Sequence, residues 1–296
     1  MRSFHRSACR SVLVMMVALI ACAPGVGGRD APQPTPSDTP SVLPTSPPIF
    51  RFAVIGDYGS GLPSQFEVAE RMCEWRAEHP FEDVFTTGDN IYPDGSEQYF
   101  QRRFFAPYDC LLADGARFHA SLGNHDYVTR RGGDVIDESA FGMPKRNYVY
   151  RSGGVRFVIA DSNVLDRAWL NDALKPKPSD RWTVVVFHHP VYSTGPHGST
   201  PGYRPSLPDL FRERGVDLIL NGHDHLYMAT SALRRIRYIV TGGGGASLYT
   251  CGDAWFVAIC QSRNHFLYVV AGPERIEVRA IPSVGPPFHR FTTTGR

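Results

Sequence analysis

Short apolar runs, rich in β-branched residues, alternate along this chain with amphipathic segments. Runs of this length predict buried strands, and they lie at 49–55, 83–87, 117–122, 155–160, 182–187 and 216–220. Segments with the spacing of amphipathic helices lie between them, at 65–76, 166–174 and 207–214. Further strands are predicted at 236–241, 255–259, 265–270 and 275–281. Alternating helices and strands followed by a strand-rich end predict an α/β protein.

Side chains that can bind metal ions follow five of these apolar runs. The blocks are Gly-Asp-Tyr-Gly (56–59), Gly-Asp-Asn-Ile-Tyr (88–92), Gly-Asn-His-Asp (123–126), Val-Val-Phe-His (185–188) and Gly-His-Asp-His (222–225). One such block alone is typical of a turn, because glycine and aspartate favour turns. Five blocks that all carry oxygen or imidazole donors instead indicate a site for two small, highly charged metal ions.

These blocks resemble the motifs of the calcineurin-like metallophosphoesterases, and the tyrosine at position 92 makes the chain resemble a purple acid phosphatase. The resemblance spans about 51–250 and is to the short, tartrate-resistant-like form, without the extra N-terminal β-domain of the large plant enzymes. It implies an α/β (α+β) fold: a four-layer αββα sandwich of two mixed β-sheets flanked by helices. The dinuclear metal site is then expected on loops at the sheet edge.

The resemblance implies seven metal ligands that hold two ions. Asp89 is expected to bridge the ions, because its two oxygens can each bind a metal. The first ion would be held also by Asp57, Tyr92 and His225, and the second by Asn124, His188 and His223. A phenolate is a hard anionic donor that favours iron(III), whereas the neutral donors of the second site suit zinc, manganese or iron(II).

Three other histidines lie close to the expected ligands. The family block Val-x-x-His ends at His188, and successive strand side chains point to opposite faces, so His189 is interpreted as a supporting or packing residue. The resemblance makes His125 and His197 catalytic residues that contact the phosphate or protonate the leaving group. An exposed loop histidine without a role is the alternative for His197.

The expected activity is hydrolysis of phosphate monoesters by direct attack of metal-bound hydroxide under mildly acidic conditions, without a phosphoenzyme. Two alternatives stay open: a phosphodiesterase or nucleotidase on the same scaffold, and a non-catalytic envelope lipoprotein. The glycine run 242–245 lacks the Lys-Ser/Thr ending of a nucleotide-binding P-loop. It is expected to let the backbone pass close to the ligands.

The first 22 residues have the pattern of a bacterial lipoprotein signal peptide. Three arginines precede an apolar run at 12–20, which is shorter than the roughly 20 residues that span a bilayer. Leu19-Ile20-Ala21-Cys22 resembles a lipoprotein cleavage box, with Cys22 as the lipidated residue. Ordinary cleavage after Ala23, with a soluble secreted or periplasmic product, is the alternative.

The remaining chain divides by composition. Residues 23–48 are rich in proline and polar residues, and we interpret them as a disordered tether. Residues 49–296 are long enough for one catalytic domain.

The net charge is only +2 and the arginines are scattered, which excludes a nucleic-acid surface. The expected partners are a small phosphate monoester and a membrane, reached through the lipid at Cys22, and the protein is expected to be a monomer in the cell envelope.

Two arginine doublets, Arg102-Arg103 and Arg130-Arg131, are expected to be solvated, with Arg130 or Arg131 as alternative contacts for an anionic substrate.

Of the six cysteines, four lie outside the targeting segment and permit three pairings. An oxidising compartment favours disulfides, and we predict Cys73–Cys110 and Cys251–Cys260. Four buried thiols are the alternative.

Overall fold

The computed structural model describes residues 49–295. The predicted signal peptide, the lipidation site Cys22 and the tether lie outside these residues, so the domain boundaries at 22 and 48 stay predictions. Within the described part, no helix is long and apolar enough to cross a membrane.

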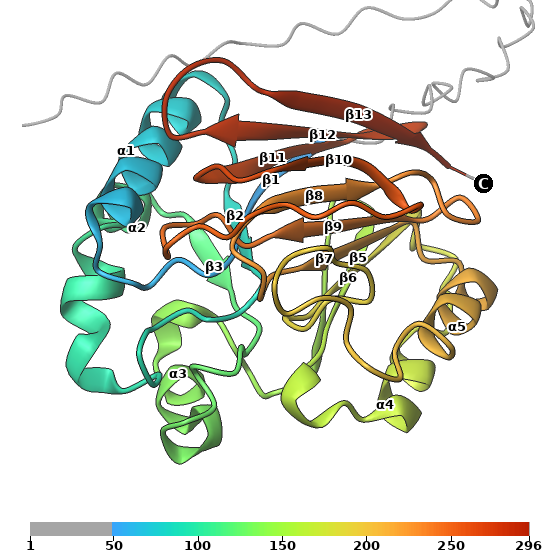
Figure 1. The fold of residues 1–296 in the computed structure, drawn as a ribbon, viewed down its shortest axis with the longest axis horizontal. Coiled ribbons are helices and arrows are strands. Elements are labelled where there is room, and N and C mark those ends of the chain that lie inside the picture. The colour runs from blue at the N-terminus through green and yellow to red at the C-terminus, as the bar shows by residue number, and fades with distance from the viewer. Residues whose placement is uncertain (1–48, 296) are drawn as a thin grey trace, which may run out of the picture. The chain divides into compact units, whose positions relative to one another are not determined.

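The strands of the described chain form two mixed sheets (Figure 1). The first sheet has the order β13-β12-β11-β1-β2-β3, with β1 (Phe50–Ile55), β2 (Asp83–Thr86), β3 (Arg117–His119), β11 (His265–Ala271), β12 (Arg275–Pro282) and β13 (His289–Thr294). The second has the order β10-β8-β9-β7-β6-β5-β4, with β4 (Tyr148–Ser152), β5 (Val155–Ile159), β6 (Trp182–Val186), β7 (Leu218–Asn221), β8 (Tyr227–Thr230), β9 (Arg237–Thr241) and β10 (Val257–Gln261).

Helices cover the outer face of each sheet. The first sheet carries α1 (Pro63–Glu78), α2 (Asp109–Ala113) and α3 (Gly133–Asp137), and the second carries α4 (Arg167–Ala173) and α5 (Leu207–Arg214) (Figure 1). Short 3-10 or π segments lie in the connections: η1 (Glu97–Tyr99), η2 (Gln101–Phe105), η3 (Arg130–Gly132), η4 (Ser139–Phe141) and η5 (Ser162–Val164). The predicted architecture of two mixed sheets flanked by helices is confirmed.

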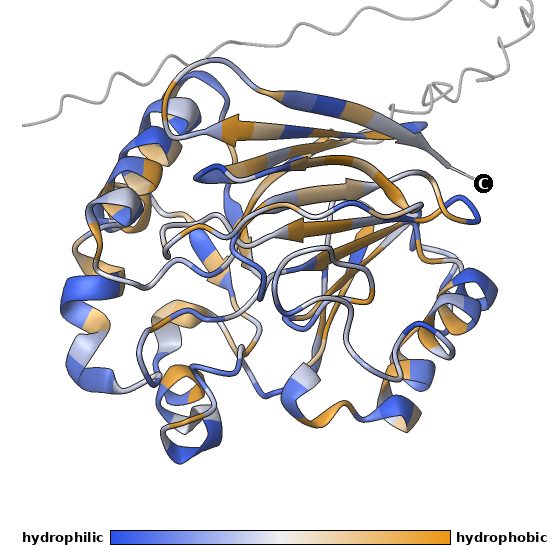
Figure 2. Ribbon diagram, viewed as in Figure 1, coloured by the Kyte–Doolittle hydropathy of each residue, from blue (hydrophilic) through white to orange (hydrophobic). Residues whose placement is uncertain are grey.

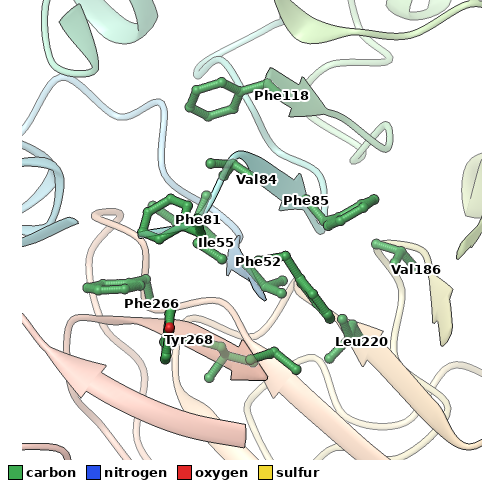
Figure 3. Close-up of a cluster of buried hydrophobic side chains, with 14 of the residues drawn as sticks. Phe52, Ile55, Phe81, Val84, Phe85, Phe118, Val186, Leu220, Phe266 and Tyr268 are labelled. Atoms are coloured by element: carbon green, nitrogen blue, oxygen red, sulfur yellow. The ribbon is translucent and has the colours of Figure 1, made fainter. Parts of the chain in front are cut away.

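Aromatic side chains fill the space between the two sheets. Phe52 and Phe85 of the first sheet lie near Val186 and Leu220 of the second (Figure 3). The ring of Phe85 stacks on that of Phe157 in β5, with 3.7 Å between the centroids. Each buried phenylalanine stabilises the fold by about 1.5–3 kcal/mol through the apolar area it removes from water. The central strands are covered on both faces and are mostly hydrophobic in Figure 2, whereas β12 and β13 also carry hydrophilic residues.

The helices are amphipathic, and their apolar sides face the sheets. In α1 the buried positions Val68, Met72 and Trp75 recur at intervals of three or four residues, which is the period of a helix face. Figure 2 shows both hydrophilic and hydrophobic residues along α1 and α5. Leu207 and Phe211 of α5 join the core on the outer face of the second sheet.

The predicted strands are found within one to three residues of their expected ends, and β4, β8, β13, α2 and α3 were not predicted. Two of the missed strands, β4 and β13, lie at sheet edges, where exposed polar residues interrupt the apolar pattern. The strand expected at 117–122 ends at His119, because the next residue, Ala120, donates its N–H to Phe141 in η4 instead of to the sheet.

Both predicted disulfides are confirmed. Cys73–Cys110 links α1 to α2, and its Cα atoms lie 6.2 Å apart. Cys251–Cys260 links the loop after β9 to β10, with a Cα separation of 5.8 Å. The second bond closes the segment 251–260, which follows the glycine run at 242–245 in the sequence.

Strand direction decides where the five motif blocks meet. In the first sheet β1, β2 and β3 are parallel, and in the second β5, β6, β7 and β9 are parallel. The blocks follow β1, β2, β3, β6 and β7, so all of them leave the carboxyl ends of parallel strands. Ligand sites in open α/β sheets form at this edge.

Candidate dinuclear metal centre

Two of the predicted ligands lie close to the hydroxyl of a third, Tyr92. This oxygen lies 3.0 Å from Nε2 of His225 and 3.4 Å from Oδ1 of Asp57. Nε2 of His225 is also 3.5 Å from the same Asp57 oxygen. We call Asp57, Tyr92 and His225 the tyrosine group; its members come from the loops after β1, β2 and β7.

A second set of donors gathers at the side chain of Asn124. Its Oδ1 lies 3.0 Å from Nε2 of His188 and 3.0 Å from Nδ1 of His223, and these two nitrogens are 3.1 Å apart. We call Asn124, His188 and His223 the asparagine group. All its metal-binding atoms are neutral donors, as predicted for the divalent ion.

Asp89 links the two groups. Its Oδ2 lies 3.1 Å from the Tyr92 hydroxyl and 3.5 Å from Nε2 of His188. Ligand atoms of Asp57, Asp89 and His225 all lie within 4.8 Å of one another. The structure therefore brings all seven predicted ligand residues into one cluster, with one carboxylate in the position expected of a bridge.

Burial favours the neutral forms of the acidic residues in the cluster. It raises the pKa of Asp57 to about 7, although His225 opposes the rise. It also raises the pKa of Tyr92, with added repulsion from Asp57 and Asp89. Acidic groups crowded in a buried site require a cation to become ionised together, so this donor set fits bound metal ions.

The histidines of the asparagine group are held in the neutral form that a metal ligand requires. Burial lowers the pKa of His188, and it lowers the pKa of His223 to about 2. Nδ1 of His188 lies 2.9 Å from the carbonyl of Thr87, and a carbonyl only accepts, so Nδ1 carries the proton. The lone pair of Nε2 then points to the cluster, which is the usual arrangement for a metal ligand.

The same arrangement recurs at His225, whose Nδ1 lies 2.8 Å from the carbonyl of Ser247. Burial opposes protonation of this ring, but Asp57 raises the pKa of His225. In the tyrosine group the carboxylate partner of the histidine therefore outweighs burial, and the pKa of His225 is raised.

The backbone is left-handed at three of the seven residues. Asp57, Asp89 and His223 have φ values of 55°, 50° and 74°, and each directly follows a glycine. Such conformations cost about 1–3 kcal/mol each and persist only where the surroundings enforce them. They turn the side chains from the strand ends into the cluster.

Two histidines lie at the rim of the cluster, one beside each group. The ring of His125 lies 4.4 Å from that of Tyr92 between centroids, and its Nδ1 is 2.6 Å from the Pro93 carbonyl. The ring of His197 is exposed and lies 4.2 Å from that of His223. The structure therefore places both histidines beside the ligand cluster.

A sequence model of the calcineurin-like phosphoesterases matches residues 50–227. The chain belongs to this family. Purple acid phosphatase 3 of Arabidopsis thaliana is 29% identical over 254 residues, which are 73% of this chain and 68% of that protein. Tartrate-resistant acid phosphatase type 5 of Sus scrofa is 23% identical over 280 residues, 79% of this chain and 78% of that protein.

The fold agrees with these relatives. A purple acid phosphatase from yellow lupin (Lupinus luteus) seeds superposes with a TM-score of 0.73 at 18% identity, over 83% of this chain and 54% of that chain. The predicted resemblance to calcineurin-like phosphoesterases and purple acid phosphatases is confirmed. This phosphoesterase is a metal-dependent hydrolase of phosphoric esters, and its family uses a dinuclear metal centre.

Two buried aspartates of the motif blocks have structural roles that the sequence did not predict. Asp126 accepts hydrogen bonds from the backbone N–H groups of Asn90, Ile91 and Gly123, at 2.9–3.1 Å. It thereby joins the loop after β2 to the loop after β3. Burial raises the pKa of Asp126 to about 7, with a further contribution from Asp89, while the N–H donors lower it.

The other aspartate is Asp224, which stands between two ligands in the sequence. It accepts a hydrogen bond of 3.0 Å from the backbone N–H of His197 and another from the hydroxyl of Ser193. The only sequence signal for both aspartates is their place inside the blocks Gly-Asn-His-Asp and Gly-His-Asp-His.

The expectation that both arginine doublets are merely solvated is wrong at one position. Arg103 is half-buried, and its guanidinium donates a hydrogen bond to the carbonyl of Tyr92. Its ring contact with Tyr99 also holds it near the ligand loop. Arg130 forms ion pairs with Asp134 and Asp137 at 2.8 and 2.9 Å, so its charge is already compensated within the protein.

The glycine run lies beside the ligands, as predicted. A Cβ atom built on Gly242 would lie 2.8 Å from Oδ2 of Asp57, which is too close for any side chain. Gly244 donates its N–H to the carbonyl of Gly56 at 2.9 Å, which joins this loop to the first motif block.

Proposed function

We propose that this phosphoesterase is an exported acid phosphatase that hydrolyses phosphate monoesters. The observation that carries the proposal is the Tyr92 hydroxyl in contact with Asp89, Asp57 and His225. A phenolate donor favours iron(III), so the proposed centre combines iron(III) in the tyrosine group with zinc, manganese or iron(II) in the asparagine group. A trivalent ion makes hydrolysis feasible at mildly acidic pH, because it acidifies water strongly.

The two ions would neutralise the phosphoryl oxygens and supply a strong oxygen nucleophile from water. His125 is oriented for proton transfer, because its Nδ1–H donates to the Pro93 carbonyl while Nε2 has no hydrogen-bond partner among residues 49–295. When protonated, Nε2 gives its proton to the ester oxygen as the bond from phosphorus to the alcohol breaks. His197 supports the same step from the side of the asparagine group. No serine, threonine or cysteine nucleophile is required.

A comparison of two substrates tests the reaction class. The purified domain, loaded with iron and zinc, is assayed at pH 5 to 6 with p-nitrophenyl phosphate and with bis(p-nitrophenyl) phosphate. We expect kcat/KM to favour the monoester by at least about tenfold, since the imidazoles of His125 and His197 beside the cluster suit a dianionic phosphoryl group. Preference for the diester would instead support a phosphodiesterase or nucleotidase. Turnover of neither ester by metal-loaded protein would support a non-catalytic envelope lipoprotein.

The proposed location is the cell envelope, with the domain of residues 49–296 held by the tether 23–48 from a lipid on Cys22. The signal-peptide pattern of residues 1–22 and the two disulfides support export. Detergent phase partitioning of the full chain and its Cys22→Ser variant tests the anchor. We expect only the unchanged chain to enter the detergent phase; partition of both into water would point to a soluble secreted or periplasmic enzyme.

A further inference from the structure

His189 directly follows the ligand His188, yet it does not point away from the cluster. The centroid of its ring lies 4.7 Å from that of His223 and 5.0 Å from that of His188. The sequence argument that alternating strand faces separate the two histidines is wrong here, because β6 already ends at Val186. Both side chains therefore lie on the loop beyond the strand and face the same site.

Ser162 fixes the orientation of this ring from the neighbouring strand end. Its Oγ accepts a hydrogen bond of 3.0 Å from the backbone N–H of His189 and lies 2.8 Å from Nδ1 of the same residue. The segment is itself held in place, because the Ser162 carbonyl accepts from the hydroxyl of Tyr203 at 3.1 Å. Asn163 also donates to the carbonyl of Gly123 at 3.2 Å.

The two contacts with Ser162 indicate which ring nitrogen of neutral His189 carries the proton. The serine oxygen receives the backbone N–H, and within residues 49–295 its own proton has only Nδ1 of His189 as an acceptor. Nδ1 then accepts, so the proton of the neutral ring is on Nε2. Protonation of the ring would add a proton at Nδ1 and leave the Nε2–H unchanged. This atom is a hydrogen-bond donor in either charge state.

The Nε2–H of His189 has no acceptor in the described part of the protein, and the residue is half-buried, whereas His188 is fully buried. A packing histidine would direct both nitrogens at protein groups or bury them. We propose that Nε2 of His189 donates a hydrogen bond to a phosphoryl oxygen of the substrate, beside the asparagine group. The inference rests on the proposed phosphatase function and adds a third imidazole to the phosphate site.

The N–H donor of His189 and the oxygens of a phosphoryl group are chemically complementary. A phosphate group presents oxygens that accept hydrogen bonds and carry negative charge, and hydrogen bonds to such oxygens are stronger than neutral ones. Ser162 holds the donor in place before the substrate binds, so little conformational freedom is lost on binding. The pair Ser162–His189 is thus suited to tighten binding of the phosphoryl group rather than of the alcohol.

Two substitutions of similar size separate this role from a structural one. His189→Gln places an amide N–H near the position of Nε2, whereas His189→Asn places its amide near Nδ1, keeps the Ser162 contact and leaves the Nε2 position empty. We expect His189→Asn to raise the KM for p-nitrophenyl phosphate and the inhibition constant of inorganic phosphate by about tenfold, the loss of one charged hydrogen bond. His189→Gln should stay within about threefold of the unchanged protein.

A measurement of binding alone accompanies the kinetics. Inorganic phosphate should raise the melting temperature of the metal-loaded protein and of His189→Gln, and raise it less for His189→Asn. Metal analysis is done on each variant, and His79→Asn is the control, since His79 stacks on Trp75 at the end of α1. An unchanged phosphate affinity in His189→Asn would overturn the inference, and so would loss of a metal ion from that variant.

The same experiment distinguishes failure of the inference from failure of the proposed function. If the unchanged protein binds metals and phosphate but hydrolyses no monoester, the proposed function is wrong. The melting-temperature shift with phosphate still tests His189 in that case, because it does not depend on turnover.

Discussion

Asp224 accepts a hydrogen bond of 3.0 Å from the backbone N–H of His197, although the two residues are 27 positions apart. Asp224 is fully buried and stands between the ligands His223 and His225 in the sequence. A residue that does not face the metals thus positions the loop that carries a proposed catalytic histidine.

We expect Asp224→Asn to lower kcat by roughly tenfold. A neutral acceptor in place of the carboxylate weakens the hydrogen bond from the His197 N–H, which positions the loop, by about 1.5 kcal/mol. Metal content should stay at the level of the unchanged protein. Steady-state kinetics and metal analysis check this result. In the double variant with His197→Ala, the two losses should not add, since both act through one residue; full additivity would contradict the proposed role.

Tyr92→Phe tests the iron(III) assignment. With the phenol in place, the metal-loaded protein should show a visible absorption band from iron(III)–phenolate charge transfer, and the variant should lack it. Activity should fall with the band, because phenylalanine has no oxygen donor. Tyr58→Phe is the matched control, since Tyr58 is buried nearby but its hydroxyl binds the side chain of Asn90. A band that persists in Tyr92→Phe would place another chromophore at the site.

Asp83, at the start of β2, makes stability depend on acid pH. Burial opposes its ionisation, but His119 at 2.8 Å and Arg117 at 3.1 Å lower the pKa of Asp83 below its ordinary 3.8. A carboxylate with a lowered folded-state pKa stabilises the protein above the unfolded value, and the contribution is lost as pH falls from 3.8 through the folded value.

We therefore expect Asp83→Asn to lower the free energy of unfolding by about 2 kcal/mol at pH 7 and by progressively less below pH 3.8. Urea unfolding at a series of pH values measures both effects. Asp172→Asn is the control, because Asp172 pairs with Lys175 in solvent and such pairs contribute little. Turnover should be unaffected, since β2 places Asp83 at the opposite end from Asp89. A constant difference across the pH range would contradict the assignment.

Gly88→Ala tests the close packing of the ligand loops. Gly88 has a φ of 92°, and a Cβ atom there would lie 2.7 Å from Nδ1 of His188 and 2.7 Å from the backbone nitrogen of Gly123. We expect the substitution to lower stability by about 2–4 kcal/mol and to reduce metal content, because it adds a steric clash to backbone strain.

The control for that substitution is Gly115→Ala. Gly115 has a similar φ of 80°, but nothing lies within 4 Å of the position of its Cβ. Gly115→Ala should lower the free energy of unfolding only through backbone strain, by about 1 kcal/mol, and leave the metal content unchanged. Thermal melts and metal analysis compare the two variants, and equal effects would show that the clash at Gly88 is relieved without cost.

Much of the site could be predicted from the sequence because its residues directly follow the strands. Asp57, Asp89 and Asn124 each follow a buried apolar run, and parallel strands present their carboxyl ends at one edge. The covered faces of both sheets make those runs continuous, so the strands were visible as uninterrupted apolar segments. Edge strands such as β13 escaped prediction, since one side of an edge strand meets solvent.

Local sequence determined most of the strands along the chain and the types of donor that follow them, and it correctly predicted both disulfides. The tertiary structure alone decided that Asp89 contacts both donor groups, that Asp224 supports His197, and that His189 faces the cluster beside His188. Those relationships depend on where loops turn after the strands end. Loop paths are set by contacts between segments far apart in the chain, such as Ser162 with His189, which no local pattern of residues encodes.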